Sequence, residues 1–222
     1  MRRLALVLFW TALLYTAVAL AGCARKKPRV AAPPAPPPPV GSTERGVASW
    51  YGKPYDGRPA ADGEIYDMEQ MVAAHRTLPF QTMVRVRNLT NNKTVDVRII
   101  DRGPFVGGRI VDLSHAAARS LEMIGSGIAQ VELTILSTPA SAAPARFAVQ
   151  VGAFRDRTNA DRMRQRMSDS YGSAKEVLRQ GDPPLWRVLA GSEPSPQAAE
   201  TLAQRIRREQ NMSSAFVVRL DP

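Results

Sequence analysis

A carboxyl group at the end of a strand-like segment is the residue of this chain best suited to acid–base chemistry. Asp101 follows residues 94–99, in which apolar and polar side chains alternate. Because strand side chains point alternately to opposite faces, Asp101 is predicted on the same face as Val97 and Ile99, where the core ends. Partial burial there favours the protonated form that a general acid needs. The residues alone leave a second interpretation open, in which Asp101 pairs with Arg102 or caps the turn.

The elements that would position Asp101 are short strands joined by turns rich in Gly, Asn and Pro. Residues 83–87 alternate like residues 94–99, and the Asn-rich segment 88–93 between them predicts a β-hairpin. Further predicted elements are strands at 46–51, 109–112 and 130–136 and a helix from Ser114, as its N-cap, to Leu121. Many short strands with such punctuation predict a small closed barrel.

The C-terminal part of the chain has a different pattern, strand–helix–strand–strand–helix–strand. Thr158 with Asp161 is predicted to form a capping box for the first helix, and Ser195 with Pro196 to open the second. The predicted strands are 147–154, 177–179, 186–189 and 216–220. This order is that of a ferredoxin-like α+β domain. RNA-recognition domains share it but need two aromatic-rich strands, and the few aromatic residues here argue against nucleic acid as a partner.

The N-terminus indicates export. Arg2 and Arg3 precede the uncharged apolar run 4–20, which could also serve as an uncleaved membrane anchor. The run ends in Leu20-Ala21-Gly22-Cys23, which resembles the lipobox of bacterial lipoproteins and contains the only cysteine of the chain. That resemblance implies cleavage before Cys23 and acylation of its thiol, and Ala24 at the next position implies sorting to the outer membrane. Two or three acyl chains on one residue anchor a protein stably.

Composition bounds the partners and the chemistry. With 44% hydrophobic and 23% charged residues among 222, the chain is of the globular class. Its net charge of +10 suits any polyanion, including nucleic acid, an anionic lipid surface or a cell wall, and export favours the wall. One cysteine excludes an intrachain disulfide, and two histidines, His75 and His115, argue against a metal site. No cofactor is expected.

Two linkers divide the chain. Seven prolines between Pro28 and Pro39 favour extended polyproline II, and 137–145 is rich in Ala, Ser and Pro. The predicted organisation is a signal peptide 1–22, a lipidated Cys23 with a linker to residue 44, a barrel at 45–137, a linker 138–145 and an α+β domain at 146–222.

Five motifs in the barrel region carry a resemblance to a known family. They are the GVASWYG segment 46–52, GEIYDM at 63–68, AHRTLPF at 74–80, DRGPF at 101–105 and GRIVDLS at 108–114. Their order and spacing resemble those of the RlpA (rare lipoprotein A) family over residues 46–136. The resemblance implies a double-psi β-barrel and, in active members, lytic transglycosylase activity on peptidoglycan.

The same resemblance implies a set of functional residues: Glu64, His75 and Asp101. It implies cleavage of the MurNAc–GlcNAc β-1,4 bond without water, giving a 1,6-anhydro end. Asp101 would act first as acid and then as base, Glu64 would stabilise the positive transition state or position the sugar, and His75 would orient one of them. Trp50 and Tyr51 would line a sugar subsite, or belong to the core; His115 is expected on the surface, and Asp112 either caps the following helix or touches substrate.

Two departures from the family pattern bear on turnover. The family has Thr before Ala–Asn or Ala–Ser where this chain has Ala60, and Asn where it has Ile100. Alternation predicts Ile100 on the opposite face from Asp101, which would make its loss harmless. Asp62 adds a like charge near Glu64 and is expected to raise the pKa of that carboxyl.

The C-terminal domain resembles the SPOR domain, which binds glycan strands stripped of stem peptides. The resemblance rests on Val149-Gln150-Val151-Gly152-Ala153-Phe154 and Trp186-Arg187-Val188. It implies a ligand face lined by Gln150, Ala153, Leu185, Trp186 and Arg187. Alternatively, the sheet only packs on the barrel.

Two functions follow from these resemblances. The first is an enzyme in the periplasm, anchored to the outer membrane and directed to peptide-poor glycan at the division septum, where proteins of the division machinery are candidate partners. The second is a binding protein that ties the outer membrane to the wall without cleavage; expansin-like loosening is a minor third.

Overall fold

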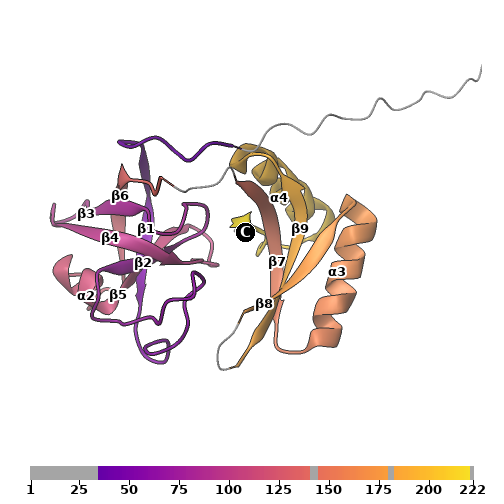
Figure 1. Cartoon of the computed structure of the whole chain (residues 1–222), viewed down its shortest axis with the longest axis horizontal. Helices are drawn as coiled ribbons and strands as arrows, with labels where there is room; N and C mark the ends of the chain where they lie inside the picture. Colours follow the sequence, from indigo (N-terminus) through magenta and orange to yellow (C-terminus); the bar gives the residue numbers. More distant parts are fainter. Residues whose placement is uncertain (1–34, 141–144, 180–182, 221–222) are drawn as a thin grey trace, which may run out of the picture. The chain divides into compact units, whose positions relative to one another are not determined.

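A computed structural model describes residues 35–140, 145–179 and 183–220, which belong to one compact unit, Pro33–Pro222 (Figure 1). The predicted signal peptide and Cys23 lie outside the described residues. Within those residues, no helix is long and apolar enough to cross a membrane.

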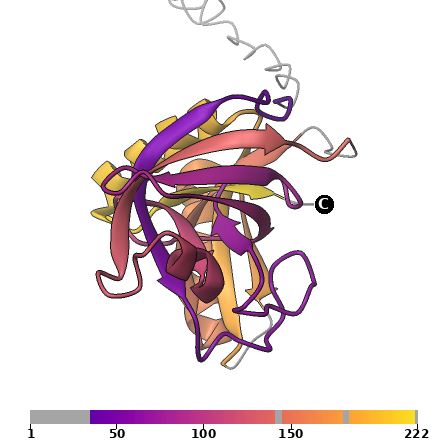
Figure 2. The ribbon, with the colours of Figure 1, turned by 90° about the vertical axis from the view of Figure 1, so that its left-hand side faces the viewer.

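The N-terminal domain is a closed barrel, as predicted, and it is built from six short strands (Figure 2). Neighbours follow the order β1-β5-β2-β4-β3-β6, and the pairs β1/β5 and β2/β4 are parallel while the others are antiparallel. The strands are β1 (Thr43–Tyr51), β2 (Val72–His75), β3 (Met83–Asn88), β4 (Thr94–Asp101), β5 (Arg109–Ser114) and β6 (Ile128–Ser137). Only β2 was not predicted, because its four residues are all buried and show no alternation.

The barrel core follows from the alternation seen in the sequence. Val84 of β3 pairs with Val97 of β4, Val86 and Ile99 lie in the same core cluster, and all four side chains are fully buried. The predicted hairpin is therefore confirmed. After β5 comes the short helix α2 (His115–Ser120), whose N-cap is Ser114 as predicted, with its hydroxyl accepting from the Ala117 N–H at 3.2 Å.

The C-terminal domain has the predicted strand–helix–strand–strand–helix–strand order (Figure 1). Its antiparallel sheet has the order β10-β7-β9-β8, with both helices on one face. The elements are β7 (Arg146–Phe154), α3 (Arg157–Tyr171), β8 (Ala174–Arg179), β9 (Leu185–Glu193), α4 (Pro196–Gln210) and β10 (Phe216–Leu220).

One helix start differs from the prediction. Helix α3 begins at Arg157, and the carboxylate of Asp156 caps it by accepting from the Asn159 N–H at 2.8 Å. The capping box of Thr158 and Asp161 was therefore wrong by about half a turn, because Asp156 is an equally good cap placed earlier. The Ser195 cap of α4 is confirmed.

The two faces of the C-terminal sheet have different surroundings. Phe147, Val149, Val151 and Val188 pack against the helices, while Ala148, Gln150, Leu189 and Val218 face the other way. We call the second side the helix-free face.

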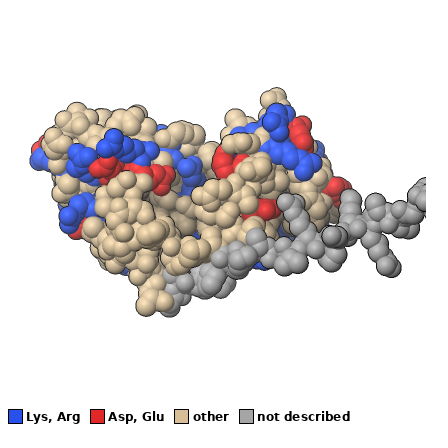
Figure 3. Space-filling view, turned by 90° about the horizontal axis from the view of Figure 1, so that it is seen from above, with Lys and Arg blue, Asp and Glu red and all other residues tan. Residues whose placement is uncertain are grey.

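Basic and acidic side chains are interleaved on the barrel surface. Arg85 pairs with Asp96 at 2.7 Å, and Arg45 and Arg87 both pair with Glu132. On the face drawn in Figure 3, acidic side chains lie beside the basic ones. The net positive charge is thus partly neutralised locally.

Candidate active site

The candidate site is a row of side chains across four neighbouring strands of the barrel. In strand register, Ser49 of β1 pairs with Asp112 of β5, Asp112 with Ala74 of β2, and Ala74 with Asp101 of β4. Paired residues point to the same side of a sheet, and adjacent strands lie about 4.8 Å apart. The two carboxyl groups therefore lie on one face with only the small Ala74 between their strands.

A β-bulge decides which face this is. Ala73 pairs with Ile99, but Ala74 pairs with Asp101, so Ile100 is an extra residue in β4. Ala73 and Ile99 point into the barrel core. Asp101 consequently lies on the outer face, and its predicted placement beside Val97 and Ile99 was wrong. A bulge adds one residue and breaks the two-residue period.

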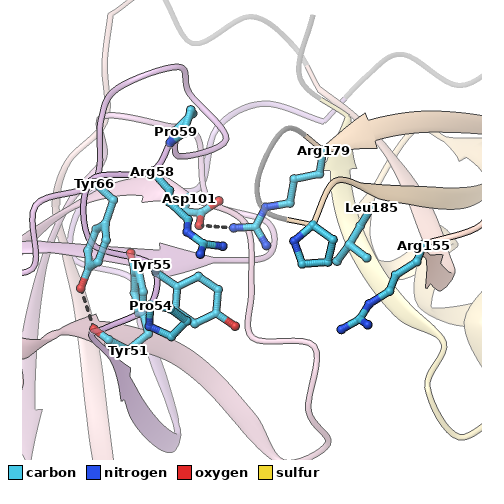
Figure 4. A pocket seen from close by; sticks show the side chains of 11 residues that line it. Tyr51, Pro54, Tyr55, Arg58, Pro59, Tyr66, Asp101, Arg155, Arg179 and Leu185 are labelled. Atoms are coloured by element: carbon cyan, nitrogen blue, oxygen red, sulfur yellow. Dashed lines mark hydrogen bonds and ion pairs between the residues drawn. The ribbon is translucent and has the colours of Figure 1, made fainter.

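Asp101 is held by donors on both of its oxygens and is only 6% exposed. Its Oδ1 accepts from the backbone N–H of Ala61 at 3.1 Å and of Arg102 at 2.7 Å. Its Oδ2 accepts from the guanidinium of Arg179, on β8 of the C-terminal domain, at 3.0 Å (Figure 4). The pairing with Arg102 expected as an alternative is present only through the backbone N–H.

Asp101 borders a cavity of about 300 Å³ (Figure 4). Tyr51 and Tyr66 stack with ring centroids 4.3 Å apart, and the Tyr66 hydroxyl donates to the Tyr51 carbonyl at 2.6 Å. The Tyr51 hydroxyl is buried without a hydrogen-bond partner among the described residues, and burial raises the pKa of Tyr51 far above its usual value. The lining is Tyr51, Pro54, Tyr55, Arg58, Pro59, Tyr66, Asp101, Arg155, Arg179, Pro183 and Leu185.

The two positions that depart from the family pattern lie beside this cavity. Ala60 and Ile100 are buried in one small cluster with Tyr66 and Val72, and Tyr51 packs against it. The prediction that Ile100 lies on the opposite face from Asp101 was wrong, for the same bulge places both on the outer face.

Asp112 is a second, half-buried carboxyl, for which the sequence left open a helix cap or a contact with substrate. Burial raises its pKa, although the hydrogen bond donated by the Ser49 hydroxyl acts in the opposite direction. Arg109 in turn donates to the Ser49 oxygen at 3.2 Å. Asp112 does not cap α2, since Ser114 does. The GRIVDLS motif was a signal for this residue, but only the strand register brings it beside Asp101.

Glu64 lies apart from the cavity. Its carboxylate accepts hydrogen bonds from the two terminal guanidinium nitrogens of Arg98, at 2.6 and 2.9 Å, and from the Gln81 amide at 2.9 Å. Hydrogen bonding from Arg98 lowers the pKa of Glu64, contrary to the expectation that Asp62 would raise it. Instead burial raises the pKa of Asp62.

His75 is buried and also faces away from Asp101. Its Nδ1 accepts from the backbone N–H groups of Thr77 and Leu78 at 3.2 and 3.1 Å, so Nε2 carries the proton and donates to Glu44 at 3.2 Å. The predicted direct contact of His75 with Asp101 or Glu64 is therefore absent. Its backbone carbonyl accepts from the Arg102 guanidinium at 3.0 Å, beside Asp101.

Trp50 and His115 form a separate pair. Trp50 packs against the barrel core, and its ring meets that of His115 edge to face with centroids 5.5 Å apart. His115 is half-buried, and its Nδ1 lies 2.9 Å from Glu69. Of the two aromatic residues predicted for a sugar subsite, the structure brings Tyr51 to the cavity and Trp50 to the core.

The residues predicted for glycan binding in the C-terminal domain lie mostly on its helix-free face. The Arg187 Nε donates to the Gln150 amide oxygen at 2.5 Å, Gln150 is 4% exposed, and Ala153 is exposed. Trp186 is the exception, because it packs among the helix-side residues with Arg157 over its ring at 4.8 Å. Alternation along β9 separates Trp186 from Arg187.

Comparison with known proteins agrees with these two domains. Residues 43–133 match the family model described as lytic transglycolase, and residues 143–219 match the SPOR domain. The chain is 35% identical over 180 residues to the endolytic peptidoglycan transglycosylase RlpA of Campylobacter jejuni, covering 80% of this chain and 59% of that protein. It is 50% identical over 99 residues to the protein of the same name from Vibrio cholerae, covering 45% and 38%. The chain belongs to the RlpA family.

Membership of the RlpA family identifies the barrel as a double-psi β-barrel and the second domain as a SPOR domain, as predicted. This RlpA-family chain spans about three fifths or less of those two relatives. Of the three polar residues implied by the family motifs, only Asp101 reaches the cavity.

Proposed function

We propose that this chain is a lytic transglycosylase that cleaves MurNAc–GlcNAc β-1,4 bonds of peptidoglycan. Asp101 carries the proposal, because it is a buried carboxyl beside a cavity on a barrel that matches the lytic transglycolase family. The relatives from C. jejuni and V. cholerae are named endolytic peptidoglycan transglycosylases, which supports the same reaction.

In the proposed reaction Asp101 carries a proton in both directions. It donates this proton to the glycosidic oxygen, and the bond from that oxygen to C1 of MurNAc breaks with positive charge developing on the sugar. The 6-hydroxyl of the same sugar then attacks C1, and Asp101 takes up its proton. A 1,6-anhydro end forms and no water is consumed, so one carboxyl suffices where a hydrolase needs two.

The other residues of the barrel would bind or position. Tyr51 stays protonated, so its unpartnered hydroxyl is available to a sugar oxygen. Glu64 would act at a distance, because its ion pair with Arg98 fixes the loop whose Ala61 N–H donates to Asp101. His75 would fix the end of β2, where its carbonyl accepts from Arg102.

The SPOR domain would direct the enzyme to peptide-poor glycan. Removal of the stem peptide frees the lactyl carboxylate of muramic acid, and Arg187 offers a charge-assisted donor on the helix-free face. Together with a lipid on Cys23, this would place the protein at the outer membrane facing the wall, in the periplasm and near the division septum.

A second function, glycan binding without cleavage, is favoured by one observation. Ala60 and Ile100 surround Tyr66 with apolar groups where the family pattern has Thr and Asn. A cavity with fewer polar groups would hold a sugar with less control over its orientation. In this case the lipid anchor and the two domains would tie the outer membrane to the wall.

One experiment separates the two functions. The soluble chain 24–222 and its Asp101→Asn variant are incubated with amidase-treated glycan, and the products are analysed by mass spectrometry. We expect 1,6-anhydro-MurNAc ends from the wild type and a loss of about 10²- to 10⁴-fold in the variant. Asp96→Asn, on the same strand but remote in register, is the matched control and should retain activity. Bound but uncleaved glycan would establish the tether instead, and reducing ends would establish a hydrolase.

A further inference from the structure

Several contacts join the SPOR domain to the barrel around the candidate active site. The Arg179 guanidinium pairs with Asp101 at 3.0 Å, and its side chain is 31% exposed against 9% for Asp101. The Arg219 N–H at the edge strand β10 donates to the Arg76 carbonyl at 3.0 Å. Phe105, four residues after Asp101, lies under the Arg187 guanidinium at 5.2 Å. The catalytic carboxyl is therefore bound directly by the other domain.

The same contacts cover part of the helix-free face. Ala148, Leu189 and Val218 are buried in one apolar cluster against which Phe105 packs. Gln150, between them in sheet register, is 4% exposed. A glycan strand cannot lie over Gln150 while Phe105 and its neighbours occupy that face.

We propose that Arg179 is a latch that makes cleavage specific for peptide-free glycan. In the free protein Arg179 is bonded to Oδ2 of Asp101, and the barrel covers part of the helix-free face. Peptide-free glycan that binds this face displaces the barrel from it, and the ion pair of Arg179 with Asp101 breaks in the same step. The proposal rests on the function proposed above and adds the residue that links substrate recognition in one domain to the reacting group in the other.

The link is a competition for one surface. Glycan and barrel exclude each other from the helix-free face, so glycan shifts the equilibrium toward the open form by its affinity for the open form alone. Glycan that still carries stem peptides binds the face poorly and leaves the latch closed. Couplings of this kind typically change an equilibrium by about 5- to 150-fold.

The size of the closed cavity supports the latch. Its volume of about 300 Å³ lies at the lower end of the range for small-molecule sites. Arg155, Arg179 and Leu185 of the SPOR domain form one side of it. A glycan strand of several sugars needs a longer groove, and opening of the two domains would provide it.

Three variants of the soluble chain 24–222 test the latch. Arg179→Gln removes the ion pair, and Val177→Asp places a charge in the apolar cluster beside Phe105. Leu178→Asp is the matched control, since Leu178 is the next residue of β8, points to the other face and is 38% exposed. We expect the first two to cleave peptide-bearing glycan about tenfold faster than the wild type, and the control to equal it. Wild-type rates in both would overturn the proposal, provided that circular dichroism shows them folded.

A readout without catalysis keeps this proposal separate from the proposed activity. Exchange of the Arg219 amide hydrogen reports the contact between the domains, because its bond goes to Arg76 of the barrel. Short peptide-free glycan oligosaccharides should accelerate this exchange in the wild type, and peptide-bearing ones should not. Faster exchange without any cleavage would retain the glycan-driven separation of the domains and refute the enzyme. Bound glycan with unchanged exchange would overturn the latch whatever the activity.

Discussion

The outer face of the barrel and the helix-free face of the SPOR sheet both depend on a β-bulge, but the bulges act in opposite directions. In β4 the extra residue places Ile100 and Asp101 together on the outer face. In β7 the register shifts between Gln150 and Gly152, and Val151 packs on the helix side. The barrel bulge adds a residue to the face that carries Asp101, whereas the sheet bulge adds one to the side that packs on the helices and returns Ala153 to the side of Gln150.

This difference shows how the two sites tolerate change. At the barrel, the bulge places a buried carboxyl on the outer face, where hydrogen-bond donors reach both of its oxygens, so substitutions there act on acidity and geometry. At the sheet, the bulge leaves the core under the helices intact and puts Gln150 and Ala153 on the helix-free face, so binding and stability are expected to depend mainly on different side chains. Five substitutions test this separation, in order of decreasing effect.

The largest effect is expected at Trp186. Trp186→Ala removes a large side chain that packs on the helix side under Arg157, and should lower the free energy of unfolding by about 2 kcal/mol. Affinity for peptide-free glycan should stay within about twofold, because the ring is on the side away from Gln150. Chemical denaturation and a binding titration measure the two quantities.

Gln150→Ala is the matched comparison. It should weaken glycan binding by about tenfold and lower the free energy of unfolding by only about 1 kcal/mol, because the Arg187 Nε loses its acceptor. A large loss of affinity in Trp186→Ala with little effect in Gln150→Ala would show that the ligand face is the helix-covered one.

Glu64 should matter less to the reaction than Asp101. Glu64→Gln breaks the bidentate pair with Arg98 and loosens the loop at Ala61, so we expect about a tenfold loss of kcat. Because Glu64 acts through Arg98, the double variant with Arg98→Ala should be no slower than Glu64→Gln alone. Additive losses in this cycle, or a loss as large as that of Asp101→Asn with a raised KM, would mean that Glu64 touches the sugar.

The sequence predicted the positions of the strands better than the faces to which their side chains point. Alternation located β3, β4 and the hairpin between them, because these strands are regular and half-buried. It placed Asp101 and Ile100 wrongly, because a bulge leaves no trace in the two-residue period. It missed β2, which is short and wholly buried. Because β2 lies between β5 and β4, the sequence could not predict the register that brings Asp112 beside Asp101.

Motif resemblance selected individual residues where periodicity could not. It named Asp101 and placed Gln150 and Ala153 on one face, although simple alternation would have separated them. It also grouped Glu64 and His75 with Asp101, whereas their hydrogen bonds go to Arg98 and Glu44. A motif records which residues matter but not the contacts through which they act.

Asp112 provides a smaller effect that depends on pH. Its pKa is raised by burial, so the folded state binds its proton more tightly than the unfolded state. Stability therefore falls as the pH rises from the usual aspartate value through the raised one. Asp112→Asn should stabilise the protein at pH 7 by on the order of 1 kcal/mol and have little effect at pH 3. Thermal unfolding at the two pH values measures this, and a loss of stability at pH 7 would contradict it.

The smallest effect is expected at Asp96, whose pKa is shifted in the opposite direction from that of Asp112. Hydrogen bonding from Arg85 lowers the pKa of Asp96, so its contribution is present above the usual aspartate value and lost as the pH falls through the lowered one. Both side chains are largely exposed, at 52% and 39%, and solvent screens them. Asp96→Asn should therefore destabilise the protein at pH 7 by only a few tenths of a kcal/mol, and not at all well below pH 3. If Asp112→Asn stabilises and Asp96→Asn destabilises the protein at pH 7, then the fold disfavours the charged form of Asp112 and favours that of Asp96. Changes of the same sign in the free energy of unfolding would mean that the outer face beside Asp101 does not treat a carboxylate differently from the exposed surface at Asp96.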